Sequence, residues 1–235
     1  MCRAVRLFFA ELRDTLRSIP GIRNKLEHLW NYYRLWIIGL GFAAGFGIFM
    51  IVRLTTAVKE NRIYAVFVNT YADLGEDTDF WNGYIAYTGY DPKEKNIQFD
   101  CRAYFDYSDN QGRGNTYYDS FVSFIDAGLL DAAVMEKDSL EAFGATGRLL
   151  DLNNARCKNL LEKYGDRLVF SVPLREEYGT GPVPVGVDIT DARKIKEYRV
   201  YEEDCCLGIG AGSRNIEAVE ALLEYLFDET QQPVQ

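Results

Sequence analysis

The sequence predicts an α/β protein in which one transmembrane helix is followed by a mostly parallel β-sheet flanked by helices. Three observations predict this fold class. An uncharged run of 18 residues lies near the N-terminus. Beyond it, short apolar runs typical of strands alternate with segments of helical periodicity, an order that favours parallel strands joined by right-handed crossovers. Hydrophobic residues make up 48% of the chain, which is enough to bury the core of one domain.

The uncharged run extends from Leu35 to Val52 and lies between Arg34 and Arg53. A helix of this length nearly crosses the hydrocarbon core of a bilayer, and the residues after Arg53 can extend it while Arg53 reaches to the interface. A buried core helix would seldom be apolar on all sides, and a signal peptide would begin closer to the terminus. Aromatic side chains that suit the membrane interface lie on the N-terminal side: Trp30, Tyr32, Tyr33 and Trp36.

The chain therefore divides into an arm over 1–34, a transmembrane helix over 35–57 and an acidic domain over 58–235. The arm holds seven Lys or Arg residues and three acids. By the positive-inside rule this bias predicts a cytoplasmic N-terminus and a C-terminal domain outside the cell membrane. Residues 53–235 contain 19 bases and 32 acids. This balance disfavours nucleic acid or anionic lipid as the partner of the domain.

The arm and the apolar helix each suggest a partner. Apolar residues at helical spacing alternate with arginines over residues 5–19. We expect this part to lie on the surface of the lipid bilayer, or alternatively to dock on another membrane protein. Gly41 and Gly45 form a Gly-x-x-x-Gly pair, which would let a helix of a permease or another membrane protein approach closely.

The first half of the domain is expected to alternate strands with helices. An apolar run predicts a strand over 63–69, and a helix over 78–87 opens with acids that suit its dipole. A second strand is expected over 96–106. Gly128 ends a helix over 116–127, and another apolar run predicts a third strand over 130–135.

The second half continues with shorter elements. Helices are predicted over 139–143 and 155–164, and strands over 168–172, 183–187 and 205–208. One apolar face predicts a closing helix: Ile216, Val219, Leu222, Leu223, Leu226 and Phe227.

Several stretches of the domain resemble a known family. They read Tyr-Phe-Asp-Tyr (104–107), Tyr-Tyr-Asp-Ser-Phe-Val-Ser-Phe-Ile-Asp-Ala-Gly (117–128), Leu-Asp-Ala-Ala-Val-Met-Glu (130–136), Gly-Arg-Leu-Leu-Asp-Leu (147–152) and a closing strand and helix over 208–226. In this order they are similar to the first lobe of extracellular, periplasmic-type solute-binding proteins. The stretch 26–39 also resembles uncharacterised single-pass membrane proteins of Gram-positive bacteria.

The resemblance implies a fold like lobe one of a type II periplasmic binding protein. A full second lobe normally needs on the order of a hundred residues. The interval from Asp166 to Asp204 is shorter than that, so we expect a reduced second lobe.

Ligands of parallel sheets bind beyond the carboxyl ends of the strands, where the chain turns into the helices. Candidate ligand-binding residues at these positions are Asn69, Thr70, Tyr71, Asp106, Tyr107, Ser108 and Glu136, with Trp81 nearby in the sequence. Aromatic faces beside carboxylates and an amide suit sugars or cationic peptides. In the alternative interpretation, the aromatic residues pack helices onto the sheet and the acids are turn or capping residues.

Enzymatic chemistry finds little support in the sequence. The sole histidine, His28, lies in the arm, so the domain has no Ser-His or Cys-His pair and no histidine ligand for a metal. Two facing carboxylates, such as Asp106 and Glu136, would suit a hydrolase. We expect no enzyme activity, no metal and no cofactor. Four cysteines of the domain allow three complete pairings outside the cell, or else are free thiols: Cys101, Cys157, Cys205 and Cys206.

Three functional hypotheses follow, and the third of them is an outer-surface hydrolase, which two facing carboxylates in a cleft would favour. The first is a membrane-tethered module that binds a small ligand, a sugar or a peptide, for transport or sensing. A convergent polar and aromatic pocket at the strand ends would favour it. The second is a degenerate binding fold that serves as a non-enzymatic interaction or scaffold protein in a membrane complex. A filled cleft and an exposed apolar patch would favour that one.

Overall fold

The chain divides into two compact units, residues 1–58 and residues 59–235. The computed structural model describes residues 13, 17–56, 59–107, 114–175, 177 and 180–228. The amphipathic arm expected over residues 5–19 lies mostly outside these described residues.

The first unit contains one long helix, α2 (Ile22–Thr56). Its segment Trp30–Arg53 is long and apolar enough to cross a membrane, with a mean hydropathy of 2.3 and none of its apolar window buried. This finding confirms the apolar helix near the N-terminus. Gly41 and Gly45 lie on it, with open space where a side chain would begin.

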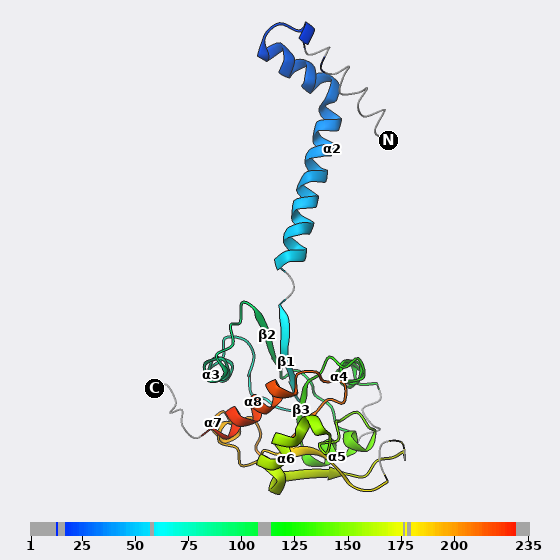
Figure 1. Ribbon diagram of the computed structural model, residues 1–235, viewed down its shortest axis with the longest axis vertical. Helices are drawn as coiled ribbons and strands as arrows, with labels where there is room; N and C mark the ends of the chain where they lie inside the picture. Colours follow the sequence, from blue (N-terminus) through cyan, green and yellow to red (C-terminus); the bar gives the residue numbers. More distant parts are fainter. Residues whose placement is uncertain are drawn as a thin grey trace. The chain divides into compact units, whose positions relative to one another are not determined.

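The second unit is built on one six-stranded sheet of order β2-β1-β3-β6-β5-β4. Figure 1 labels three of its strands, β1, β2 and β3. Each strand overlaps a run that the sequence predicts as a strand, although β2 ends at Asp100, before the expected residue 106. The strands are β1 (Glu60–Phe67), β2 (Lys95–Asp100), β3 (Ala132–Met135), β4 (Leu168–Ser171), β5 (Val183–Asp188) and β6 (Cys206–Ile209).

The sheet is mixed, so the expectation of a mostly parallel sheet was wrong. β1 pairs in parallel with β2 and β3, whereas the pairs β3–β6, β6–β5 and β5–β4 are antiparallel. Parallel neighbours need a long crossover connection, and helices supply it between the first three strands. Between β4 and β5, the described residues contain no α-helix that could act as a crossover, and these two strands pair antiparallel.

The reduced second lobe expected between Asp166 and Asp204 is also corrected. Both β4 and β5 continue the same sheet, and the whole of 59–235 forms one compact unit. Three consecutive antiparallel pairs let these strands add to the existing sheet and share its core, so no separate lobe is built.

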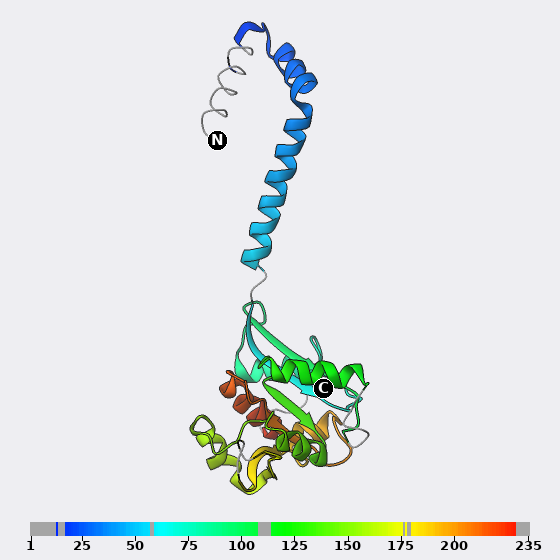
Figure 2. The ribbon, with the colours of Figure 1, turned by 90° about the vertical axis from the view of Figure 1, so that its right-hand side faces the viewer.

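Helices cover both faces of the sheet (Figures 1 and 2). One face carries α3, α6, α7 and α8, and the other carries α4 and α5. The helices are α3 (Asp79–Thr88), α4 (Thr116–Asp126), α5 (Lys137–Ala145), α6 (Lys158–Tyr164), α7 (Arg193–Glu197) and α8 (Ile216–Phe227), with short 3₁₀ turns at Ala155–Cys157 and Gly165–Arg167.

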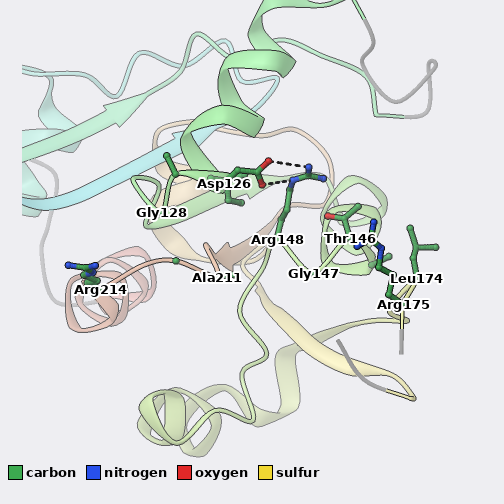
Figure 3. A pocket seen from close by; sticks show the side chains of 13 residues that line it. Asp126, Gly128, Thr146, Gly147, Arg148, Leu174, Arg175, Ala211 and Arg214 are labelled. Atoms are coloured by element: carbon green, nitrogen blue, oxygen red, sulfur yellow. Dashed lines mark hydrogen bonds and ion pairs between the residues drawn. The ribbon is translucent and has the colours of Figure 1, made fainter. Parts of the chain in front are cut away.

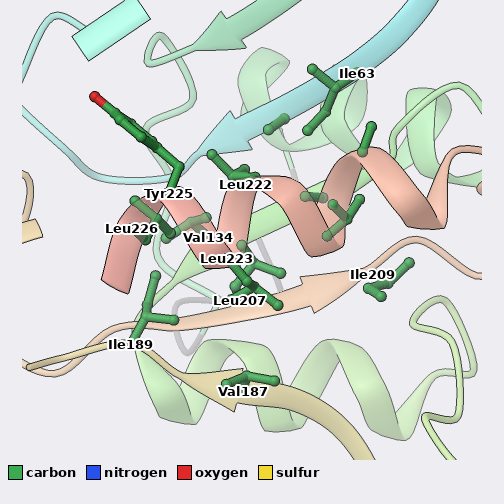
Figure 4. Packing of buried hydrophobic residues seen from close by; sticks show 14 of the residues in the cluster. Ile63, Val134, Val187, Ile189, Leu207, Ile209, Leu222, Leu223, Tyr225 and Leu226 are labelled. Carbon is green, nitrogen blue, oxygen red and sulfur yellow. The ribbon is translucent and has the colours of Figure 1, made fainter. Parts of the chain in front are cut away.

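The core follows from the alternation of side chains along the strands. In β1, Ile63 and Phe67 point to the face covered by α8, whereas Val66 points to the opposite face. On α8, Leu222 and Leu223 pack toward the sheet (Figure 4). Among the described residues, the buried hydrophobic side chains all lie between residues 63 and 226. Because this core lies wholly within the second unit, we expect that unit to fold on its own.

The four cysteines of the domain are free thiols. Burial raises the pKa of Cys205 to about 12 and that of Cys101 to about 11. Both thiols are therefore protonated, and poorly nucleophilic, near neutral pH.

Candidate functional site

The crevice where an open α/β sheet binds its ligand is filled in this protein. That crevice lies between β1 and β3, because the chain leaves β1 over one face of the sheet and reaches β3 over the other. Tyr201, from the segment between α7 and β6, occupies it. Its hydroxyl donates to the carbonyl oxygens of Val68 at 2.7 Å and Val134 at 2.9 Å. The protein's own side chain thus takes the place of a ligand at the strand ends.

The segment that carries Tyr201 is held on the sheet by a second bond. The buried hydroxyl of Thr70 donates to the carbonyl oxygen of Val200 at 2.6 Å. Burial raises the pKa of Tyr201 well above its ordinary value. The hydroxyl is therefore neutral and remains a hydrogen-bond donor across the physiological pH range.

Three of the candidate residues are engaged within the fold. Thr70 holds the segment described above. Asn69 has a positive φ of 60°, and its carboxamide donates to the carbonyl oxygen of Phe105 at 2.9 Å and accepts from the Phe105 N–H at 3.0 Å. Trp81 is buried, and its Nε1 donates to the carbonyl oxygen of Ile97 at 3.1 Å. The burial of Trp81 agrees with the packing alternative, whereas Asn69 and Thr70, which that alternative did not cover, are bonded to backbone groups of the domain itself.

The candidate acids Asp106 and Glu136 lie at the same edge of the sheet and are both exposed. Burial, and then the carboxylates of Glu203, Asp204, Asp106 and Asp138, raise the pKa of Glu136. This edge is therefore strongly negative. In the part of the chain that the structure describes, no group of three or more acids, cysteines or histidines is arranged to hold a metal.

The remaining candidates are Tyr107, Ser108 and Tyr71. Tyr107 is half-buried, with its ring centroid 4.8 Å from that of Phe143, so it packs against α5. Ser108 lies outside the described residues. Tyr71 is 95% exposed and is therefore available to a partner.

Tyr71 belongs to a group of exposed tyrosines at the carboxyl ends of β1 and β2, which we call the tyrosine surface: Tyr71, Tyr104 and Tyr117. They line an open hollow of about 750 Å³ that also contains Asp73 and Glu76. The ring centroids of Tyr71 and Tyr104 lie 5.7 Å apart. Exposed rings beside carboxylates make this surface suited to binding.

Local hydrogen bonds position the tyrosine surface. The Tyr104 hydroxyl donates to the carbonyl oxygen of Thr70. The Asn115 carboxamide accepts from the Tyr117 N–H at 2.9 Å and donates to the carbonyl oxygen of Tyr104 at 2.8 Å. Asn115 therefore caps α4 and fixes its first residues against the loop that follows β2.

A second, smaller hollow adjoins the tyrosine surface. Its volume is about 270 Å³, and it is mainly apolar, with side chains of Val66, Phe121 and Phe124 in its wall. We call it the apolar hollow. It shares Asp100, Arg102 and Tyr117 with the larger hollow.

An ion pair stands between the two hollows. The Arg102 guanidinium donates to both carboxylate oxygens of Asp100, from Nε at 2.9 Å and from Nη2 at 2.7 Å. This guanidinium lowers the pKa of Asp100. Asp100 is thus held as an ionised, paired carboxylate, unsuited to act as a general base.

Sequence reasoning missed Tyr104, Tyr117 and Arg102. The tyrosines fell inside elements expected as strand and helix, where an aromatic side chain usually packs. An earlier end for β2 would have placed Tyr104 in a connecting loop.

A further hollow of about 710 Å³ lies at the opposite edge of the sheet, where β3 begins and β6 ends (Figure 3). Arginines are its main charged groups. Arg148 donates to both carboxylate oxygens of Asp126, at 2.8 and 3.2 Å, while Arg175 and Arg214 also line it.

Comparison of the chain with protein-family models, with curated proteins and with solved structures found no match.

Proposed function

We propose that this chain is a membrane-anchored recognition domain without enzymatic activity, which binds a polypeptide segment at the tyrosine surface. The filled crevice is the main support. With Tyr201 bonded to Val68 and Val134, the usual place for a small ligand is occupied, and exposed aromatic groups lie outside it. This combination favours the interaction protein over a carrier of small solutes.

The chemistry of the occupant follows from the two adjoining hollows. The larger one has exposed tyrosine rings beside the acids Asp73 and Glu76, which suits a basic side chain through charge and cation–π attraction. The apolar hollow beside Phe124 suits an aliphatic or aromatic side chain. A peptide that carries a basic and an apolar side chain fills both, whereas a sugar leaves the apolar hollow unused.

The charge of the domain supports a cationic partner. Residues 59–235 contain 18 bases and 32 acids. An excess of negative charge raises the rate at which a basic segment finds the surface, and this effect falls with ionic strength.

The apolar helix α2 provides the anchor. Its composition and length suit a single span, and the seven bases of residues 1–34 favour a cytoplasmic N-terminus with the domain outside. The partner then belongs to the exterior, as a segment of a permease or another membrane complex.

Fluorescence anisotropy of the isolated domain, residues 59–235, tests the binding surface. The probes are labelled peptides that pair arginine with leucine or phenylalanine at different spacings, with acidic and uncharged peptides of equal length for comparison. We expect the basic-apolar peptides to bind, and Tyr117→Ala to weaken binding at least tenfold. Phe170→Ala is the matched control, because Phe170 is a similarly exposed ring on the edge strand β4.

Three results contradict the proposal. They are equal binding of acidic and basic peptides, equal effects of Tyr117→Ala and Phe170→Ala, and displacement of the peptide by soluble oligosaccharides.

A further inference from the structure

Arginines gather at the end of the sheet where β1 and β3 begin, opposite the tyrosine surface, although the domain as a whole is acidic. Two hollows lie at this edge, of about 710 and 400 Å³, and both are lined by Arg214. We call the five arginines that line them the arginine edge: Arg62, Arg148, Arg156, Arg175 and Arg214. Three carboxylates accompany them, those of Asp126, Glu217 and Glu220. Local charge is therefore positive where the sum over the domain is negative.

The arginines differ in how far acids neutralise them. Arg148 is bound by Asp126, and Arg62 lies 3.5 Å from Glu217. Arg175 pairs with Glu177 at 3.2 Å, but both side chains are more than half exposed, so this pair holds the guanidinium only weakly.

Two of the arginines form no ion pair with an acid among the residues that the structure describes. Arg156 donates to the carbonyl oxygen of Ser213 at 2.9 Å, a contact that leaves its charge uncompensated. Arg214 is exposed, and among the described residues it forms no ion pair. Arg156, Arg175 and Arg214 are therefore the groups most available to an anion.

The positions of the arginine side chains suit several separate phosphate groups better than one bound phosphate. In Figure 3, Arg214 and Arg175 lie on opposite sides of Arg148, and the three side chains do not converge on a point. A single bound phosphate would require convergent guanidinium groups. Spread guanidinium groups instead match a surface that presents anionic groups side by side.

An exposed apolar side chain accompanies these charges. Leu174, 74% exposed, lines the same hollow as Arg175. Amphipathic helices bind anionic lipid surfaces by combining basic side chains with apolar ones, and this hollow presents the same two kinds of side chain. The strand that starts at this edge, β1, is also the one that follows the apolar helix in the sequence.

We propose that the arginine edge binds the head groups of anionic phospholipids. The negative net charge of the domain disfavoured anionic lipid as a partner, but a net charge does not show how the charges are distributed over the surface. Acids gather instead at the opposite end of the sheet, where burial and then the carboxylates of Glu203, Asp204, Asp106 and Asp138 raise the pKa of Glu136. Charges farther than a Debye length, about 8 Å at physiological salt, are largely screened, so the local arginines decide the contact.

Flotation of the isolated domain with vesicles tests this inference. The vesicles consist of phosphatidylcholine alone or of phosphatidylcholine mixed with phosphatidylglycerol. We expect binding to the mixed vesicles only, and its loss at high salt. The variant Arg175→Gln/Arg214→Gln removes two charges and should lower the partition coefficient about 30-fold. Lys137→Gln/Lys196→Gln removes two exposed charges elsewhere and should bind as the unchanged domain does.

The outcomes separate lipid from free phosphate and from failed folding. Thermal melts of both double variants should match that of the unchanged domain. Equal binding to neutral and anionic vesicles, or equal losses in the two double variants, overturns the proposal. So does stabilisation of the domain by inorganic phosphate without vesicle binding, since that result assigns the arginines to a soluble anion. None of these results tests the proposal that the tyrosine surface binds a peptide, so the two proposals can fail separately.

Discussion

The hydroxyl of Tyr201 lies 2.9 Å from the carbonyl oxygen of Val134, and the two residues are separated by 67 positions in the chain. This contact joins the segment before β6 to the carboxyl end of β3. The same hydroxyl reaches Val68 at the end of β1. The two strand ends are themselves joined, because the Val68 N–H donates to the Val134 carbonyl oxygen at 2.8 Å, and Tyr201 lies across both of them, where a ligand would otherwise bind.

Tyr201→Phe should destabilise the isolated domain by about 1–2 kcal/mol, because it removes the hydroxyl that donates to the Val68 carbonyl oxygen, whereas the Val134 carbonyl oxygen keeps the Val68 N–H as a donor. Urea unfolding followed by circular dichroism measures the change. Tyr71→Phe is the matched control, since Tyr71 is 95% exposed and its loss of a hydroxyl should change stability by less than about 0.5 kcal/mol. Equal stability of the two variants would show that the Tyr201 bonds do not hold the crevice closed.

Trp81→Ala should lower the stability of the domain, because Trp81 is part of the core and does not lie on a binding surface. The sequence suggested Trp81 as a ligand-binding residue, whose loss would leave the fold intact. The structure buries this side chain between α3 and the sheet, so its truncation should cost about 3–5 kcal/mol. Denaturant titration measures this loss, and Tyr71→Ala, which removes an exposed ring, should leave the midpoint nearly unchanged. A Trp81→Ala domain as stable as the unchanged one contradicts the packing role.

The strands and helices were predictable because their signals are local. Apolar runs such as 63–69 and the closing face of α8 are recognisable within a few residues, and the structure has an element at each. The direction of β6 was not predictable in this way. A strand pairs where the whole sheet has room for it, and β6 lies between β3 and β5, which are far from each other in the sequence.

The sequence predicted where the candidate site lies, at the carboxyl ends of the strands, but not which side chains are exposed there. The strand-end rule found Tyr71, which is exposed, together with Asn69 and Thr70, which are not free to bind. Whether a side chain at a strand end meets solvent or another loop depends on distant segments. Tyr201 lies 131 positions beyond Thr70, and no local feature marks it as the residue that fills the crevice.

Glu136→Gln should stabilise the domain at neutral pH. Burial and neighbouring carboxylates raise the pKa of Glu136 in the folded state, so between the unfolded and the folded pKa the native protein binds more protons than the unfolded chain. Stability from this group therefore increases as pH falls through the folded pKa, and above that pKa the ionised carboxylate is a destabilising charge. Replacing it removes this penalty.

Thermal melts of the isolated domain across pH measure this effect. The melting temperature of Glu136→Gln should exceed that of the unchanged domain at pH 7, and the difference should vanish below the unfolded pKa of glutamate, about 4.3. Glu94→Gln makes the same chemical change at another exposed position and should show no such trend. A lower melting temperature for Glu136→Gln at pH 7 contradicts the repulsion among these acids.

Protease treatment of intact cells that produce the full chain should remove the domain and leave a fragment that ends near residue 60. We expect this result because the charge bias around α2, with seven bases in residues 1–34, favours the proposed orientation with the arm in the cytoplasm. Immunoblotting with tags at the two ends follows the cleavage: the C-terminal tag should be lost while the N-terminal tag is retained on a membrane-bound fragment. A cytoplasmic enzyme of the same cells should stay intact, which confirms that the cells are sealed. Loss of the N-terminal tag with protection of the domain would reverse the orientation, and a full chain that fractionates without detergent as a soluble protein would exclude the anchor.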